Sequence, residues 1–170
     1  MSPNDTSETI TIQITKGYSV VVDRIDEDLS DFKWQAEVDD YTVYARRNLT
    51  RVNGKRPSEL MHRIIMSRVL GYTLTPNIKV DHRDGNGLNN RRDNLRIASD
   101  SENMRNSRRP KNNTSGFKGV SWHKTYKKWY AAIRYNGKSI HLGSFSTPQE
   151  AHKAYCDAAV KYHGDFARFE

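Results

Sequence analysis

The sequence predicts an α+β protein built from two small modules rather than one large domain. Only 35% of the 170 residues are hydrophobic and mean hydropathy is −0.88, which is a lean core for a single globule of this length. Short alternating segments separated by turn residues predict strands, and apolar residues at helical spacing predict helices. A polar, basic stretch broken by Pro110 separates two such sets. We therefore expect a first module over 10–105, a basic linker over 106–114 and a second module over 115–170.

The first module begins with a β-rich region. Its alternating and apolar runs predict one hairpin over residues 10–22 and a second over 32–47. The acidic segment 23–31 between them predicts a turn or short helix, and residues 51–57 predict a polar loop. The segment 59–70 has Leu60, Ile64, Ile65 and Val69 at helical spacing, and Gly71 follows it as a helix C-terminus prefers. This region therefore predicts strands that lead into one amphipathic helix.

A compact ββα motif is predicted at about 78–107. A strand at 78–82 leads into a polar loop at 83–93, and a second apolar stretch follows at 95–98. Ser99 with Glu102 three residues later forms a capping box, which predicts a helix that starts at Asp100 and contains Asn103.

The second module predicts a three-stranded antiparallel sheet packed on one helix. Strands are expected at 117–122, 129–135 and 138–142, with the hairpin turn Asn136-Gly137 between the last two. Thr147, Pro148 and Glu150 form an N-terminal capping signal for a helix that runs to about Tyr162.

The charge of the chain is concentrated at one end. The net charge is +8, and residues 104–170 hold 13 Lys and Arg against 4 Asp and Glu, a net +9, while residues 1–58 are net −2. Such a distribution is the footprint of a polyanion-binding surface. One cysteine allows no internal disulfide, the N-terminus has no secretory signal, and no run of about 18 apolar residues exists. We expect a soluble intracellular, cytoplasmic protein with no membrane partner.

The segment 79–103 contains residue types suited to phosphodiester hydrolysis. A neutral histidine such as His82 can take a proton from water near pH 7. Asp81 and Asn103 offer oxygen ligands, which hard divalent cations prefer. Adjacent strand residues point to opposite faces, so Asp81 and His82 share a site only if the strand ends or bends there. The alternative is a surface ion pair beside ordinary Asn-rich turns.

This pattern resembles the HNH nuclease signature in its Asp-His…Asn…Asn form, as found in phage intron-encoded homing endonucleases. The resemblance covers roughly residues 10–110 and implies a ββα-metal nuclease. It implies His82 as general base, Asp81 and Asn103 as ligands of a divalent metal, Mg²⁺ with Mn²⁺ as a substitute, and Asn94 as the residue that orients the histidine and ties the loop. Arg96 is assigned to DNA phosphate contact, with a solvated surface position as the equal alternative.

Residues 114–170 resemble the APETALA/ethylene-response-factor DNA-binding domain, through Phe117-Lys118-Gly119-Val120, residues 129–134 and residues 141–145. In that family the exposed face of the sheet enters the major groove. Strand alternation then assigns an outward-facing set: Lys118, Ser121, His123, Lys128, Tyr130, Arg134, Ser139 and His141. Arg134 is the candidate for guanine recognition, whereas Lys118 and Lys128 suit phosphate. Ser121, His123, Ser139 and His141 replace arginines and a tryptophan of the plant-type pattern, so the base sequence recognised does not carry over.

The two resemblances together predict a metal-dependent, site-specific endonuclease of double-stranded DNA, with homing as its role. A phage or bacterial host and a monomeric state are expected. The main alternative is a non-enzymatic DNA-binding regulator with a degraded HNH module, and a nuclease that acts on RNA or on particular DNA structures is the second. Metal-dependent cleavage separates the first alternative from the prediction.

Overall fold

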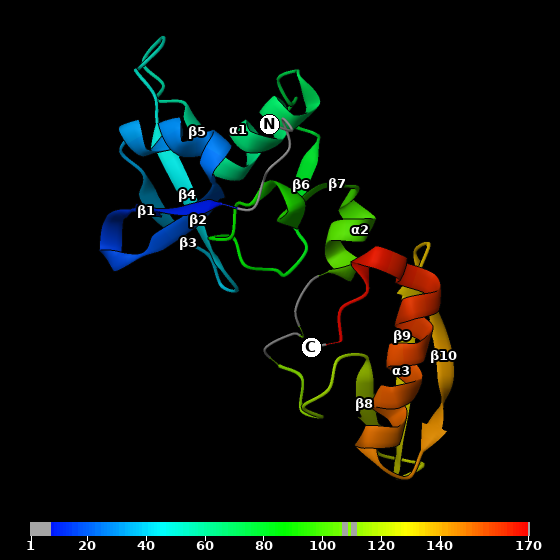
Figure 1. Ribbon diagram of the computed structural model, residues 1–170. Helices are drawn as coiled ribbons and strands as arrows, with labels where there is room; N and C mark the ends of the chain where they lie inside the picture. The colour runs from blue at the N-terminus through cyan, green and yellow to red at the C-terminus, as the bar shows by residue number, and fades with distance from the viewer. Residues whose placement is uncertain (1–7, 107–108, 110–111, 170) are drawn as a thin grey trace. The chain divides into compact units, whose positions relative to one another are not determined.

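A computed structural model describes residues 8–106, 109 and 112–169 of the chain (Figure 1). The chain divides into two compact units, Met1–Ala98 and Ser99–Glu170. The linker expected at 106–114 falls partly on residues 107, 108, 110 and 111, which lie outside the described residues.

The first unit consists of short antiparallel sheets around one helix. Its elements are β1 (Thr9–Gln13), β2 (Ser19–Asp23), β3 (Gln35–Val38), β4 (Val43–Asn48), β5 (Ser58–Leu60), α1 (Met61–Leu70), β6 (Lys79–His82) and β7 (Leu95–Ala98). The sheets are β1-β2, β3-β4-β5 and β6-β7. Both predicted hairpins are confirmed, and the acidic segment forms a 3₁₀ helix (Arg24–Asp31). Two further 3₁₀ turns lie at Thr15–Gly17 and Arg92–Asn94.

The strand β5 was not predicted, and it shortens the expected helix. Glu59 and Leu60 pair with β4, so α1 begins at Met61 rather than at residue 59. The Arg47 guanidinium lies 2.7 Å from the Glu59 carboxylate across the two strands, an ion pair that helical spacing alone does not reveal. The helix ends at Gly71 in the left-handed conformation (φ 75°), as the sequence predicts.

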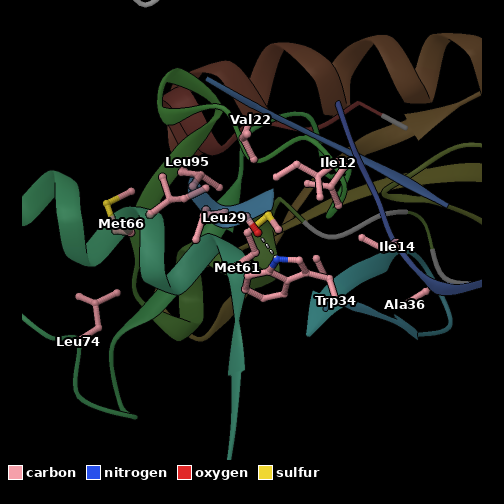
Figure 2. Packing of buried hydrophobic residues seen from close by; sticks show 13 residues of the cluster. Ile12, Ile14, Val22, Leu29, Trp34, Ala36, Met61, Met66, Leu74 and Leu95 are labelled. Carbon is pink, nitrogen blue, oxygen red and sulfur yellow. Dashed lines mark hydrogen bonds between the residues drawn. The ribbon is translucent and has the colours of Figure 1, made fainter. Parts of the chain in front are cut away.

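A single core joins the β-rich region to the β6-β7 ribbon (Figure 2). Leu29, Met61 and Ile65 are fully buried at its centre. The Trp34 indole packs among them and donates a hydrogen bond of 2.8 Å to the Leu29 carbonyl. Leu95, the first residue of β7, belongs to the same core. The end of the loop between β6 and β7 is therefore anchored by hydrophobic packing.

The strand β2 holds that loop from the other side. The Val21 amide donates to the Leu88 carbonyl at 2.9 Å, and the Val21 carbonyl accepts from the Asn90 amide at 2.8 Å. The buried Asp23 carboxylate accepts a hydrogen bond of 2.7 Å from the Arg92 amide. Residues 88–92 therefore take their positions from a strand near the start of the chain.

The second unit consists of a helix, a three-stranded antiparallel sheet and a longer helix. Its elements are α2 (Asp100–Arg105), β8 (Val120–His123), β9 (Lys128–Tyr135), β10 (Lys138–Phe145) and α3 (Pro148–His163), followed by a 3₁₀ turn (Gly164–Phe166). The order in the sheet is β10-β9-β8. Capping boxes form at Ser99/Glu102 and Thr147/Glu150, as predicted. β10 runs three residues beyond its predicted end, past a register shift between His141 and Gly143.

The helix α3 covers one face of this sheet. Ala131 and Ile133 of β9 are buried on that face, together with Ala151 and Tyr155 of α3. The predicted sheet packed on one helix is confirmed. Among the residues that the structure describes, none of the helices is both long and apolar enough to cross a membrane.

Gly119 lies where the chain enters β8, and its substitution gives a test of this packing. A Cβ at this position would lie 2.0 Å from the Tyr155 ring, and φ is 74°. We expect Gly119→Ala to destabilise the second unit by roughly 2–4 kcal/mol, because steric overlap adds to backbone strain. Gly116 has a similar φ of 82° but nothing within 4 Å of a Cβ, so Gly116→Ala should cost only about 1 kcal/mol in urea unfolding. Equal losses would contradict the packing argument.

Candidate active site and nucleic-acid interface

The loop between β6 and β7 is organised by Asp84 and Asn94. The Asp84 carboxylate accepts hydrogen bonds from the Asn86 amide at 2.8 Å, the Asn89 side chain at 2.8 Å and the Asn94 side chain at 3.0 Å. Burial opposes the charge of Asp84, but these three bonds outweigh it and lower the pKa of the carboxyl. Asn94 also donates to the Asn89 carbonyl at 2.7 Å and accepts from the Asp84 amide. The buried Asn94 side chain therefore ties the loop closed.

His82 ends β6 at the mouth of this loop, and its imidazole is only 4% exposed. Its ring lies against His62 of α1, with ring centroids 5.0 Å apart in an edge-on arrangement, and against Tyr44 of β4 at 5.9 Å. Burial lowers the pKa of His82, so the imidazole is neutral at pH 7 and can accept a proton. The side chain has the protonation state that a general base needs.

An asparagine that the sequence analysis did not single out contacts this histidine. The Asn90 Oδ1 lies 3.4 Å from the His82 Nε2, and Asn90 is fully buried. Asn94, which was predicted to orient the histidine, has its described hydrogen bonds within the loop. The signal for Asn90 was present as the Asn89-Asn90 pair, but a run of asparagines in a loop also suits plain turn geometry.

Asp81 precedes His82 and pairs with Arg96 on the neighbouring strand. The Arg96 Nε and Nη2 donate to the Asp81 Oδ2 at 2.9 and 2.7 Å, and both side chains are buried. The pairing follows from the register of β6 and β7, in which Asp81 lies opposite Arg96 and His82 opposite Leu95. Arg96 is buried, so the solvated surface position does not apply to it. Its guanidinium is engaged by the carboxylate beside the candidate base, and its contact with DNA phosphate stays a prediction.

The predicted metal ligands are a carboxylate in the first unit and an amide in the second. Asn103 is exposed on α2, which belongs to the second unit. Its role as a metal ligand therefore stays a prediction. Within the described ranges, no three His, Cys, Asp or Glu side chains gather in a group that could hold a metal ion. Mg²⁺ usually keeps several waters and takes only one or two protein carboxylates, so a donor set built on Asp81 fits this cation better than zinc.

The face of the C-terminal sheet opposite α3 holds the predicted DNA-contacting residues. Ser121, Lys128, Arg134, Ser139 and His141 are exposed there. Strand register places Arg134 beside Ser139 and places Lys128 beside His123.

Aromatic rings cross the middle of this face. Tyr130 lies between His123 and His141, with ring centroids at 4.5 and 4.8 Å. His123 also contacts the exposed Tyr126 at 4.8 Å. The face therefore combines a row of rings with a cation near each end of β9.

Lys118 does not belong to this face. It precedes β8, and its ammonium donates a hydrogen bond of 2.8 Å to the Arg105 carbonyl of α2. Burial lowers the pKa of Lys118 to about 8, and the nearby Arg168 charge contributes in the same direction. The expected outward orientation of Lys118 is therefore wrong, because the residue lies in the turn before the strand and the alternation rule does not reach it.

Comparison with known proteins agrees with the geometry of the first unit. The family model of HNH endonucleases matches residues 59–105. The chain is 41% identical over 90 residues to protein 3.8 of Escherichia phage T7, which covers 53% of this chain and 74% of that protein. It is 47% identical over 58 residues to the H-N-H endonuclease F-TflI of Escherichia phage T5, which covers 32% of this chain and 29% of that protein. The chain belongs to the HNH endonucleases.

The C-terminal unit of this HNH endonuclease matches a second family. The model of the AP2 domain covers residues 115–165. The chain is 37% identical over 65 residues to the AP2-like ethylene-responsive transcription factor TOE2 of Arabidopsis thaliana, covering 38% of this chain and 13% of that protein. No solved protein structure matches the chain significantly. The predicted fusion of an HNH module with an AP2-like domain is confirmed.

His62 makes the HNH unit sensitive to acid. Its ring is buried and its Nδ1 has no hydrogen-bond partner. Burial, with repulsion from His82 and Arg63, lowers its pKa to about 3 from 6.5. Between pH 6.5 and 3 the His62 imidazole is therefore protonated in the unfolded chain but neutral in the folded chain. We expect the free energy of unfolding to decrease as pH falls through this range, by up to about 5 kcal/mol.

Urea unfolding measured across this pH range tests the expectation. A His62→Phe variant keeps a ring against Tyr44 and His82 but cannot be protonated. Its stability should fall less between pH 6.5 and 3 than that of the wild-type endonuclease. Parallel curves for the two proteins would show that His62 is not the responsible group.

Proposed function

We propose that this HNH endonuclease hydrolyses phosphodiester bonds in double-stranded DNA in a metal-dependent, site-specific manner. The observation that carries the proposal is the buried, neutral His82 at the end of β6, next to Asp81 and contacted by Asn90. A histidine with a lowered pKa is available as a base throughout the neutral range. The HNH family match over the same residues supports the assignment.

In the proposed mechanism, His82 removes a proton from the water that attacks the phosphorus. Asp81 and Asn103 would hold the divalent cation, Mg²⁺ or Mn²⁺, with waters and phosphate oxygens as the remaining ligands. When bound, the cation neutralises charge on the phosphate and stabilises the leaving oxygen. Arg96 holds the Asp81 carboxylate in a fixed orientation through its two hydrogen bonds. Asn94 and Asp84 keep the loop closed around the base.

Plasmid cleavage tests the enzymatic part of the proposal. Supercoiled DNA that contains candidate target sites should be nicked or linearised in Mg²⁺ or Mn²⁺, and EDTA should stop the reaction. The ratio of nicked to linear product reports whether one strand or both are cut. Stable binding without cleavage in both metals, across many targets, would instead support the DNA-binding regulator.

The AP2 unit is proposed to supply affinity and part of the target choice. Lys128 and Arg134 lie at the two ends of β9 on its exposed face, where Lys128 suits phosphate and Arg134 suits a guanine edge. Arg134→Ala should relax the preference at one base position, whereas Lys128→Ala should weaken binding to all sequences alike. Homing is the proposed biological role, and a target that lacks an inserted gene would be its natural substrate.

The ionic-strength dependence of binding tests the contribution of the basic unit. If the C-terminal unit neutralises about 5 phosphates, the logarithm of the association constant should fall with the logarithm of salt at a slope near −4.5. Fluorescence anisotropy with labelled duplex at several salt concentrations measures the slope. Deletion of residues 110–170 should make it shallower and should weaken binding. An unchanged slope and affinity would remove the AP2 unit from the interface.

A further inference from the structure

We propose that Asn90 is a positioning residue that fixes the tautomer of His82, so that the imidazole donates from Nε2 and keeps the lone pair on Nδ1. The assignment rests on the proposed role of His82 as the base. It gives Asn90 a function, and it names Nδ1 as the atom that accepts the proton from water. The supporting observations are the contacts of the Asn90 side chain and the way in which its backbone is held.

The orientation of the Asn90 amide group is determined by its second contact. The Asn90 Nδ2 donates a hydrogen bond of 3.1 Å to the Gly87 carbonyl. A carbonyl can only accept, so the nitrogen of the amide must face Gly87 and the oxygen must face His82. The Oδ1 then lies 3.4 Å from the His82 Nε2. An amide oxygen can only accept, so the proton of the neutral imidazole belongs on Nε2.

Gly87 is itself held in place, which makes its carbonyl a fixed reference. Its amide donates to the Thr42 hydroxyl at 2.8 Å, and a Cβ at this position would lie 2.5 Å from the Val43 carbonyl and 2.6 Å from the Tyr44 ring. The same Tyr44 ring lies against His82. The amide and the imidazole are therefore aligned from one side by β4 and its neighbours.

The backbone of Asn90 is held by the N-terminal hairpin. Its amide donates to the Val21 carbonyl at 2.8 Å, and the residue has no exposed surface. The residue that orients His82 is therefore held by a backbone hydrogen bond to β2. The strand β2 lies outside residues 59–105, which match the HNH family model. The N-terminal hairpin consequently acts on the reaction through Asn90 and does more than complete the core.

Nitrogen NMR of the full-length protein tests the proposal directly. The six histidines are labelled with ¹⁵N, and two-bond proton–nitrogen correlations at neutral pH distinguish a protonated ring nitrogen from one with a lone pair. The His82 signals are assigned by their loss in His82→Gln. We expect the wild-type protein to show Nε2 protonated and Nδ1 with the lone pair. A proton on Nδ1 of His82 in the wild-type protein would overturn the proposal without recourse to any variant.

Three variants extend the test. Asn90→Leu, which has a similar shape but no acceptor, should give a mixture of tautomers and slow cleavage by roughly 10²-fold or more. Asn90→Asp keeps the acceptor and should retain the wild-type tautomer. Asn89→Leu, the control, loses a hydrogen bond to Asp84 in the same loop and should also keep the tautomer. Retention of the wild-type tautomer in a folded Asn90→Leu, or its loss in Asn89→Leu, would overturn the proposal.

The tautomer is read without DNA, so the proposal and the nuclease assignment can fail separately. An Nε2-protonated His82 in a protein that cuts no DNA would leave the positioning role standing and reject the nuclease. A cleaving enzyme with the opposite tautomer would reject the positioning role alone.

Discussion

Replacement of His82 with alanine is expected to abolish DNA cleavage while leaving DNA binding largely intact. A positioned general base contributes about 10²–10⁴-fold to the rate. His82 is the imidazole that ends β6 next to Asp81. The ring is buried against Tyr44 and His62, so it adds little surface to a DNA interface. Single-turnover plasmid cleavage measures the first effect, and anisotropy with labelled duplex measures the second.

Asp93→Ala provides the matched control for this variant. Asp93 lies in the same loop, but its carboxylate is exposed and pairs with the Arg91 guanidinium at 2.7 Å. Cleavage by Asp93→Ala should equal that of the wild-type enzyme. Cleavage by His82→Ala at the wild-type rate would remove His82 from the mechanism. Loss of activity in both variants would mean that the loop tolerates no change and would contradict the specific role of His82.

The second large effect is expected at Asp26, whose carboxylate is fully buried between two arginines. It accepts bonds of 2.7 and 3.0 Å from Arg92 and one of 2.9 Å from Arg68. Removal of the Asp26 carboxylate leaves the Arg92 guanidinium without the carboxylate that it pairs with, and the loss of a buried ion-pair partner typically costs about 3–5 kcal/mol. Asp26→Ala should therefore lower the free energy of unfolding by about that amount in urea titrations.

Asp28 offers a comparison within the same cluster. It makes two short bonds with Arg68, at 2.7 and 2.6 Å, but about half of its side chain is exposed. The Arg68 guanidinium lowers the pKa of Asp28. Because solvent screens this pair, Asp28→Ala should cost at most about 1 kcal/mol. Similar losses for Asp26→Ala and Asp28→Ala would show that burial does not set the strength of these contacts.

Local chemistry explains which parts of the fold could be predicted. Asn136 and Gly137 both have positive φ, 48° and 77°, which is what the Asn-Gly dipeptide favours between strands. The capping pairs Ser99/Glu102 and Thr147/Glu150 mark helix starts because each satisfies backbone donors within four residues. His82 could be predicted as the candidate base because the Asp-His pair and the asparagines that follow it lie close together in the sequence.

Long-range pairing explains what could not be predicted. The contact between Asp81 and Arg96 depends on the register of β6 and β7, and a shift by one residue would have left Arg96 on the other face. The Asn90 that contacts His82 has its backbone amide bonded to Val21 of β2, which lies 69 residues earlier in the chain. Asp26 looked like part of an acidic surface turn, since the arginines that bury it follow 42 and 66 residues later.

The hydrogen bonds between β2 and the loop that joins β6 to β7 have consequences for synthesis and for gene exchange. Arg92 follows Asp23 by 69 residues. At a synthesis rate of about 5–20 residues per second, Arg92 is added about 3–14 s after Asp23. A gene fragment confined to residues 59–105 would encode the whole signature but not this strand. Recombination that moved the nuclease between proteins would have to carry the N-terminal hairpin with it.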